Sequence, residues 1–266
     1  MSISSTVVQR ADIRFHEAPE ALRRFVGCFW VVTADRGATI RIVPDATTSI
    51  SIQLQNNVPP AWFLRGPLVR PEERRFTSPA HLVGVRLRPG VAFVLSGIPA
   101  HTIVGRHTRL SDAGVFHDLV SGESSLHDAA ECIDALQGFL VRRLEGASVH
   151  DVVAGAVREI EREHGCVQVA DIAARTGVSP RHLNRLMRVW VGYGAKRLAN
   201  VIRFQETLTQ IDDSPSRSGA VLAAETGYFD QAHLSLDVTR FAGATPGALA
   251  SGCVADFSKT RCDDLP

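Results

Sequence analysis

Six basic side chains and no acidic one lie between Ser179 and Gln205. The six are Arg181, Arg185, Arg188, Lys196, Arg197 and Arg203. Such groups bind phosphate oxygens, and Arg also forms paired hydrogen bonds with base edges. The whole chain of 266 residues is nearly balanced, with 29 Lys and Arg against 28 Asp and Glu. The local concentration of charge therefore favours a surface that binds a polyanion, with a plain solvated surface as the alternative.

A helix must present these basic groups, and the sequence predicts where it begins. Ser179 is suited to the N-cap and Pro180 to the first helical position, so we expect a helix that runs to about Trp190. Three apolar residues share one face of this helix and should point inward: Leu183, Leu186 and Met187. Three polar residues lie on the outer face of its N-terminal half: Arg181, Asn184 and Arg185.

A faint internal repeat precedes this helix and recurs further along the chain. Ala173 lies four residues before Gly177, and Ala223 lies four residues before Gly227. In a helix-turn-helix unit the small residue lets the second helix cross the first closely, and the Gly adopts the positive φ of the turn. The repeat therefore predicts two helix-turn-helix units in one all-α segment.

The second unit has its own helix signal, because Asp230 is a natural N-cap for a helix that runs to about Phe241. Three of its residues should face inward: Leu234, Val238 and Phe241. We expect Val149–Glu163 to support the first unit and Tyr193–Asp212 to form a long helix between the units. Two units about one turn of DNA apart, roughly 34 Å, can enter successive major grooves without a dimer. Double-stranded DNA is the expected partner.

The same segment resembles the AraC/XylS family of transcription regulators over about residues 150–250. Three strings of residues carry the resemblance: Ile172-Ala173 with Gly177-Val178-Ser179-Pro180-Arg181, then Gly227-Tyr228-Phe229-Asp230-Gln231-Ala232-His233-Leu234, and Gly243-Ala244-Thr245-Pro246. The resemblance implies a tandem helix-turn-helix domain and a protein that regulates transcription by binding specific DNA sequences.

The resemblance also implies which residues contact DNA. In the first unit the candidates are Ser179, Pro180, Arg181, Asn184, Arg185 and Arg188. In the second unit they are Gln231, His233 and Ser235. This chain departs from the family after Ser235, where Leu236 replaces a common basic residue, Asp237 follows, and Val238 replaces a frequent Phe. We therefore expect the second unit to bind more weakly, as a backbone clamp or as a loose reader of bases.

The N-terminal half has a β-rich pattern, which predicts a barrel or a sandwich. Short strand-like runs alternate with Pro, Gly and Asn: Phe29–Thr33, Thr39–Val43, Ser49–Gln55 and Leu82–Leu87. A short helix should follow Pro89-Gly90. A longer one over Ser125–Leu144 carries an apolar stripe that must pack on its own barrel or on a second copy. The fold class is thus α+β, with a candidate effector or dimerisation domain at 1–147, the DNA-binding domain at 148–252 and a tail at 253–266.

This half resembles a poorly characterised sensor domain found on such regulators. The resemblance rests on Ile42-Val43-Pro44-Asp45, Arg65-Gly66-Pro67, Gly84-Val85-Arg86-Leu87-Arg88-Pro89-Gly90 and Leu110-Ser111-Asp112. It implies a cupin-like β-barrel followed by helices, and a concave interior suits a small-molecule effector. Five residues fit a pocket and the ordinary core or surface equally well: Trp30, Asp45, Trp62, Phe63 and Arg65. The ligand-binding residues are therefore unknown, and Arg86 and Arg88 can face the interior or solvent.

Metal and enzymatic chemistry find little support. His81, His101, His107 and His117 lack metal-ligand spacing, and the five scattered cysteines form no C-x-x-C pair. We therefore expect no metal and no cofactor, and mostly reduced thiols. No Gly-x-Ser-x-Gly, phosphate-binding loop or His-Glu-x-x-His string occurs, so we expect no catalytic residue and no enzyme. The sequence has no leader pattern and no membrane-length apolar run, which predicts a cytoplasmic protein.

Two hypotheses follow from these patterns. The first is a sequence-specific transcription regulator controlled by a small-molecule effector in the N-terminal domain, with RNA polymerase and a second copy as further candidate partners. The second is a ligand-binding or catalytic β-domain whose C-terminal helices serve protein contacts, which Leu236 and Asp237 favour. A steep fall of DNA affinity with salt would distinguish the first from the second.

Overall fold

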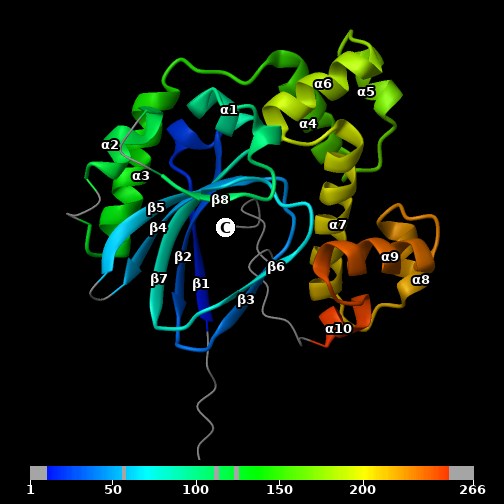
Figure 1. Ribbon diagram of the computed structural model, residues 1–266. Coiled ribbons are helices and arrows are strands. Elements are labelled where there is room, and N and C mark those ends of the chain that lie inside the picture. Colours follow the sequence, from blue (N-terminus) through cyan, green and yellow to red (C-terminus); the bar gives the residue numbers. More distant parts are fainter. Residues whose placement is uncertain (1–10, 56–57, 111–113, 123–125, 252–266) are drawn as a thin grey trace, which may run out of the picture.

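The computed structural model describes residues 11–55, 58–110, 114–122 and 126–251. The predicted tail at 253–266, with Cys253 and Cys262, lies outside these residues, as do Ser125 and the Ser111-Asp112 pair. The chain has a β-rich part followed by an all-helical part, which confirms the α+β fold class (Figure 1). None of the described helices is long and apolar enough to cross a membrane.

Six strands of the β-rich part form one antiparallel sheet. In spatial order they are β1 (Ala11–Glu17), β2 (Val26–Ala34), β7 (Ala80–Leu87), β4 (Thr48–Gln55), β5 (Val58–Arg65) and β8 (His107–Arg109). A separate two-stranded sheet pairs β3 (Thr39–Ile42) with β6 (Glu72–Arg75). The predicted strands at 29–33, 39–43, 49–55 and 82–87 are all present, whereas β1, β5, β6 and β8 lie outside the predicted runs.

The six-stranded sheet has a different core on each face, and the alternation of residues along β4 shows why. Ile50 and Ile52 are fully buried in a core with the helices that follow the sheet. Ser49 and Ser51 point to the other side and line a small pocket. A second core between the two sheets contains Trp30 and Leu82. The β-rich part therefore consists of helices, a large sheet and a small sheet, in that order.

The helices of this part are short, apart from one. They are η1 (Glu20–Leu22), α1 (Val91–Ser96), η2 (Ala100–Thr102), η3 (Gly114–Phe116), α2 (His117–Val120) and α3 (Ala129–Leu144). Helix α3 begins after Asp128, whose carboxylate accepts a hydrogen bond from the amide of Glu131 at 2.9 Å. Its apolar stripe, with Leu136 and Phe139, is buried in the same core as Ile50. The apolar stripe was expected to pack on its own barrel or on a second copy of the chain. In the structure it packs on the six-stranded sheet of the same chain.

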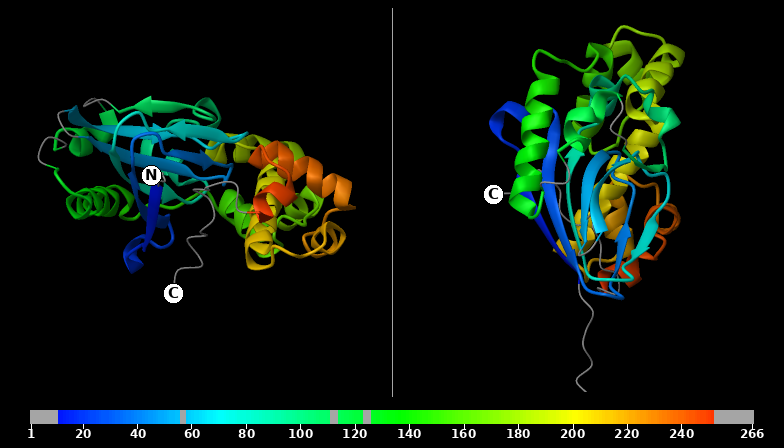
Figure 2. Two further views of the ribbon diagram at one scale, coloured as in Figure 1. Left: turned by 90° about the horizontal axis from the view of Figure 1, so that it is seen from below. Right: turned by 60° about the vertical axis from the view of Figure 1, so that its left-hand side comes forward.

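The described residues of the helical part, 148–251, form seven helices. They are α4 (Asp151–Arg162), α5 (Val169–Arg175), α6 (Pro180–Val191), α7 (Ala195–Asp213), α8 (Gly219–Glu225), α9 (Gln231–Ala242) and α10 (Pro246–Ala250). Helices α7, α9 and α10 lie on the side of the β-rich part that carries β3 and β6, whereas α6 packs against α1 and η2 (Figures 1 and 2). Cys132 and Cys166 are free thiols, whereas Cys28 is disulfide-bonded, so the expected reduced state is wrong for Cys28.

Candidate nucleic-acid interface

Helices α5 and α6 form the first predicted helix-turn-helix unit. Gly177 in the turn has a φ of 70°, a conformation that favours glycine. The hydroxyl of Ser179 accepts a hydrogen bond from the amide of His182 at 3.2 Å, and Pro180 takes the first helical position. Ala173 is buried where the two helices cross. The local signals in the sequence therefore predicted this unit correctly.

The outer face of α6 carries a row of long polar side chains. Four predicted contact residues are exposed on it: Arg181, Asn184, Arg185 and Arg188. The inner face is buried at Leu183, Leu186 and Met187, as predicted. Lys196 and Arg197 are also exposed, at the start of α7. This surface has the size and charge of a helix that enters a major groove and contacts the flanking phosphates.

The remaining residue of the predicted basic cluster, Arg203, has another role. Its guanidinium is buried, donates a hydrogen bond to the carbonyl of Gly227 at 3.0 Å, and lies over the ring of Tyr228. Counting it among phosphate-binding groups was wrong, because the residue faces into the helical core. It fixes the turn of the second unit onto α7 instead.

Helices α8 and α9 form the second unit with the same turn geometry. Gly227 has a φ of 71°, and the carboxylate of Asp230 accepts a hydrogen bond from the amide of His233 at 2.7 Å. Leu234 and Val238 are fully buried. The predicted N-cap and inward face of α9 are therefore confirmed.

The outer face of α9 differs in chemistry from that of α6. Gln231 and His233 are exposed at its start and Ser235 is half-buried. Phe229, just before the helix, is 91% exposed, and Leu236 is 70% exposed. The second unit thus presents two large apolar side chains among its polar ones, whereas the first presents mainly guanidinium groups.

Asp237 does not add an acidic group to this face. The side chain is buried, and its carboxylate lies 4.0 Å from Nε2 of His233, while the His233 ring packs edge-on against Tyr228. A carboxylate that points into the protein lies farther from a phosphate bound at the surface than an exposed one does, and repulsion falls with distance. Asp237 is therefore a weaker reason to expect poor DNA binding by the second unit than its position in the sequence implied.

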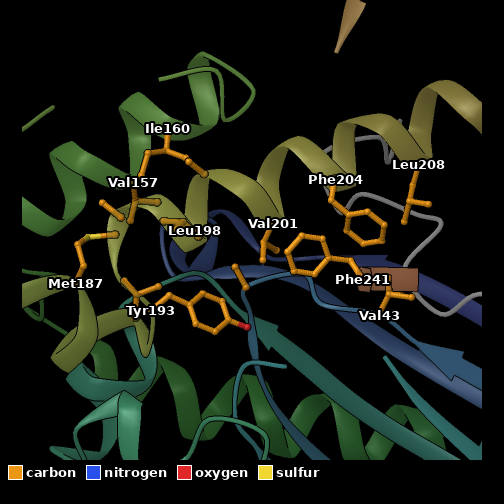
Figure 3. Close-up of a cluster of buried hydrophobic side chains, with 14 of the residues drawn as sticks. Val43, Val157, Ile160, Met187, Tyr193, Leu198, Val201, Phe204, Leu208 and Phe241 are labelled. Carbon is orange, nitrogen blue, oxygen red and sulfur yellow. The ribbon is translucent and has the colours of Figure 1, made fainter. Parts of the chain in front are cut away.

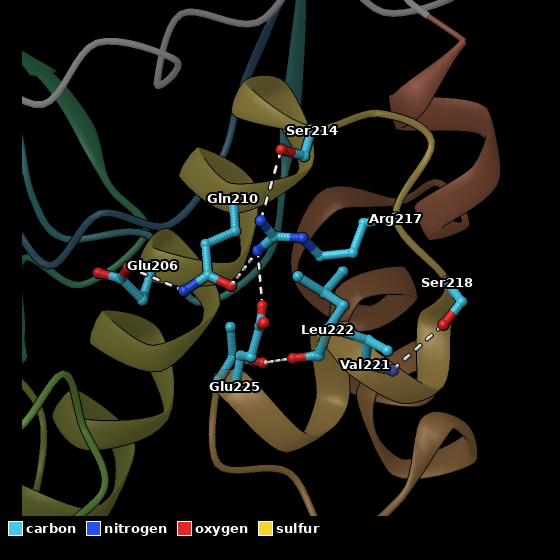
Figure 4. Close-up of polar contacts among 9 residues, drawn as sticks. Glu206, Gln210, Ser214, Arg217, Ser218, Val221, Leu222 and Glu225 are labelled. Carbon is cyan, nitrogen blue, oxygen red and sulfur yellow. Dashed lines mark hydrogen bonds and ion pairs between the residues drawn. The ribbon is translucent and has the colours of Figure 1, made fainter.

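Helix α7 holds the two units together. It has 19 residues and therefore spans about 28 Å. Phe204 on α7 packs against Phe241 of α9, with the ring centres 5.2 Å apart. At its far end Arg217 donates hydrogen bonds to Glu225 of α8 at 2.6 Å and to Gln210 at 3.4 Å (Figure 4). The second unit is thus fixed to α7, which begins four residues after α6 of the first unit ends.

The helical part is also joined to the β-rich part. Val43 is buried among Phe204, Leu208 and Phe241, far from it in sequence (Figure 3). Next to it, Nε2 of Gln205 donates a hydrogen bond to the carbonyl of Pro44 at 2.5 Å. Sequence reasoning missed these contacts, since neither residue type nor spacing signals them.

Two further hydrogen bonds cross the same boundary. The hydroxyl of Tyr193 donates to the carbonyl of Leu68, and Nη1 of Arg41 donates to the carbonyl of Ala242, at the end of α9, at 3.2 Å. Burial raises the pKa of Tyr193, so the phenol stays a donor at neutral pH. These three hydrogen bonds therefore join the β-rich part to the junction of α6 and α7, to the middle of α7 and to the end of α9.

The residues weighed for a ligand pocket fall into two groups. Trp30, Asp45 and Arg65 line a pocket between the two sheets, whereas Trp62 is buried in the core beneath the helices. Phe63 stacks on the ring of His107. The sequence did not predict whether Arg86 and Arg88 face the interior or solvent. The guanidinium of Arg86 points inward and lies 3.5 Å from a carboxylate oxygen of Asp45, while Arg88 donates a hydrogen bond to the carbonyl of Arg23. Within the described residues, no three His, Cys, Asp or Glu side chains cluster as metal ligands.

Two family models match the chain. Residues 172–251 match a helix-turn-helix domain, and residues 14–109 match a domain of unknown function (DUF6597). No curated protein matches the chain.

Some solved structures are similar to the chain at low identity. The C-terminal domain of AraT, a response regulator from Geobacillus stearothermophilus, has a TM-score of 0.37 and 19% identity, and the match covers 40% of this chain and 88% of AraT's domain. ToxT from Vibrio cholerae has a TM-score of 0.45 and 10% identity, with 91% and 97% covered. ToxT with a bound unsaturated fatty acid has a TM-score of 0.42 and 10% identity, with 92% and 95% covered.

Proposed function

We propose that this chain, which carries an AraC-type helix-turn-helix domain over residues 172–251, is a transcription regulator that binds specific DNA sequences. The observation that carries the proposal is the exposed row of Arg181, Asn184, Arg185 and Arg188 on α6, on a unit that α7 links to a second one. Residues 1–147 act as the effector domain and 148–252 as the DNA-binding domain. The protein binds its DNA in the cytoplasm.

Helix α6 supplies the charged part of the interface. Arg181, Asn184 and Arg185 lie near its N-terminus, where a helix inserted in the major groove meets base edges. Each pair of hydrogen bonds from one side chain to one base favours the correct base over a wrong one by about 1–3 kcal/mol. Ser179 and Pro180 sit at the helix start, beside the backbone amides that bind phosphate, and Arg188, two turns further along the same face, contacts the DNA backbone.

Helix α9 supplies a different kind of contact. Gln231, His233 and Ser235 can hydrogen-bond to bases or phosphates, but Phe229 and Leu236 are the larger exposed groups. In the major groove the apolar feature of a base pair is the 5-methyl group of thymine. The second unit therefore prefers a thymine-containing half-site, and its binding depends less on salt than that of the first unit.

The test is a selection of bound sequences from a random pool of duplex DNA by the full-length protein. We expect a motif with two elements about 10 base pairs apart. The variant R181A/R185A should lose the element bound by α6. Its matched control, R36A/R142A, removes the same charge from exposed residues of the β-rich part and should retain both elements.

The second candidate function, a protein-contact role for the helical part, is favoured by the exposure of Phe229 and Leu236 alone. No enrichment by the wild-type protein, combined with no salt-dependent binding to duplex DNA, would support it and contradict the proposal. RNA polymerase and a second copy of the chain stay candidate partners. The apolar stripe of α3 is buried, so Val141 is the large apolar residue that this helix exposes to a second copy.

A further inference from the structure

The pocket between the two sheets of the β-rich part combines an apolar wall with buried positive charge. Trp30, Ile40, Ile42 and Leu82 provide much of the wall. Hydroxyl groups of Thr47, Ser49 and Ser51 line it as well, and the guanidinium groups of Arg65 and Arg74 reach it from β5 and β6. Such a mixture of apolar surface and a few convergent polar groups is typical of a small-molecule site.

The arginines of this pocket are incompletely paired. Nη1 of Arg65 is buried, lies 3.5 Å from a carboxylate oxygen of Glu72, and makes no hydrogen bond to any described residue. Arg74 donates to the side-chain oxygen of Gln53 at 2.6 Å, which is a neutral partner. Asp45 is the acidic residue of the lining, and it already pairs with Arg86. A buried donor of this kind favours an anionic acceptor.

Three basic groups in or beside the pocket, Arg65, Arg74 and His107, have lowered pKa values. Burial lowers the pKa of Arg65, and burial together with the charge of Arg65 lowers that of Arg74. The pKa of His107 falls to about 4 because the ring is partly desolvated and lies near both guanidinium groups. A bound anion would relieve this repulsion.

The pocket is almost closed in this structure. Its free volume is about 30 Å³, room for on the order of one or two water molecules. Protein interiors are close-packed, so a larger ligand can enter only if the pocket wall moves outward. The position of that wall decides what the movement would affect.

Residues 42–47 form a wall of the pocket that consists of a single segment of chain. One side of this segment lines the pocket and the other side contacts the helical part. Ile42, Asp45 and Thr47 point into the pocket. The residues between them face the helical part: Val43 and Ala46 are buried in its core, and the carbonyl of Pro44 accepts the hydrogen bond from Gln205. An outward shift of this segment therefore acts directly on α7.

A second part of the pocket wall repeats this arrangement. The side chain of Leu68 lines the pocket, while its carbonyl accepts the hydrogen bond from Tyr193 at the junction of α6 and α7. On β3, next to Ile42, Arg41 holds the carbonyl of Ala242 at the end of α9. Three hydrogen bonds that hold the helical part thus start from the pocket wall or the residue beside it.

We propose that this pocket binds a small monocarboxylate with an apolar body, and that its entry shifts residues 41–47 and Leu68 and loosens their hydrogen bonds to Tyr193, α7 and α9. The carboxylate takes the free donor of Arg65 and the charge of Arg74, and the body lies against Trp30 and the aliphatic wall. The binding site stands on the pocket alone. Its effect on DNA binding rests on the proposed function.

Ligand binding is tested without DNA. The full-length protein is titrated calorimetrically, and its thermal unfolding is followed, with butyrate, benzoate, phenylacetate and indole-3-acetate, each beside its primary amide as an uncharged control. We expect at least one acid to bind and to raise the melting temperature, and its amide to bind on the order of tenfold to a hundredfold more weakly. Equal effects of acid and amide, or no effect of any acid, would overturn the site.

Variants identify the pocket as the place of binding. R65Q should weaken the acid to the level of its amide, whereas R65K should retain part of the affinity because it keeps the charge. Should R65Q unfold, R74Q serves instead, since Arg74 is less enclosed and bonds to a neutral side chain. If an acid binds R65Q or R74Q as tightly as it binds the wild type, the acid occupies another site, and the assignment of this pocket as the binding site is wrong.

Coupling is tested with a variant that lacks two of the shared hydrogen bonds, Y193F/Q205M. Both replacements keep the size of the side chain and remove only its hydrogen-bonding group. We expect this variant to bind the acid, but its affinity for a selected duplex should no longer change when the acid is added. The wild-type affinity should change, and by linkage the duplex should change the affinity for the acid by the same factor.

The outcomes separate the two proposals. An acid that binds but leaves both DNA affinity and hydrogen exchange of α7 unchanged overturns the coupling and leaves the site intact. A protein that binds the acid, with faster hydrogen exchange in α7, but binds no DNA contradicts the proposed function and supports this inference.

Discussion

Gln205, in the middle of α7, donates a hydrogen bond from Nε2 to the carbonyl oxygen of Pro44, in the β-rich part, at 2.5 Å. Gln205 is buried, and Val43 next to Pro44 lies inside the core of the helical part. The two parts of the chain are therefore joined by a buried polar contact within an apolar interface. Such a contact fixes one relative position, because any slip leaves a buried amide or carbonyl without a partner.

Replacing Gln205 with Met should destabilise the protein by about 1–2 kcal/mol, since the carbonyl of Pro44 loses its donor while packing is preserved. The measurement is urea unfolding of the full-length protein. Gln210→Met is the matched control, because Gln210 lies on the same helix and bonds only to side chains. An equal loss in both variants would show that the contact to Pro44 adds no stability.

Arg188 and Arg203 should respond in opposite ways to loss of their charge. Arg188→Ala is expected to lower the slope of log affinity against log salt by about 1, with little change in stability, since the residue is exposed. Arg203→Met should leave that slope unchanged and cost about 2 kcal/mol, because its hydrogen bond to Gly227 is buried. Salt titrations of DNA binding and urea unfolding of both variants measure the two effects. A reduced salt slope for Arg203→Met would place it at the interface after all.

The difference between these arginines shows where sequence reasoning succeeds. Ser179 and Asp230 were predicted as helix caps because capping depends on the next three residues. Arg203 has the same side chain as its neighbours in the basic cluster, and only the packing of α7 against Tyr228 buries it. Strand β5 was missed because Pro59 and Pro60 interrupt the usual pattern. The contacts of Tyr193 and Gln205 join distant segments and leave no local signal.

Leu236 should make binding sensitive to single methyl groups in DNA. Replacing thymine by deoxyuridine in the half-site of α9 removes only the 5-methyl group, and each methyl that contacts Leu236 or Phe229 should be worth about 0.8 kcal/mol. Leu236→Ala should abolish most of this difference. The same replacement in the half-site of α6 is the control. Equal affinities for thymine and uracil duplexes would contradict an apolar contact at α9.

His107 predicts how stability depends on pH. Its pKa is about 4 in the folded protein, below the ordinary value of 6.5, so between these values the unfolded chain binds more protons. Stability should therefore fall as the pH drops from about 6.5 towards 4, and His107→Gln should show a smaller fall. Urea unfolding across this range measures both proteins. Because a carboxylate beside Arg65 would raise the pKa of His107 towards its ordinary value, a ligand in the pocket should make this fall smaller and end it at a higher pH. An identical pH profile for the variant would exclude His107 as the source.

Gly177 and Gly227 provide a matched pair, since they occupy the same turn in the two units with φ of 70° and 71°. Alanine at either position adopts a left-handed conformation that costs about 1–2 kcal/mol. A Cβ at Gly177 would meet open space, whereas one at Gly227 would collide with Sγ of Cys166. Gly227→Ala should therefore be the more destabilising variant by urea unfolding, and Gly227→Ala combined with Cys166→Ala should approach the cost of Gly177→Ala. Equal losses of stability in the two single variants would show that the turn of the second unit can accommodate a Cβ at Gly227 beside Cys166.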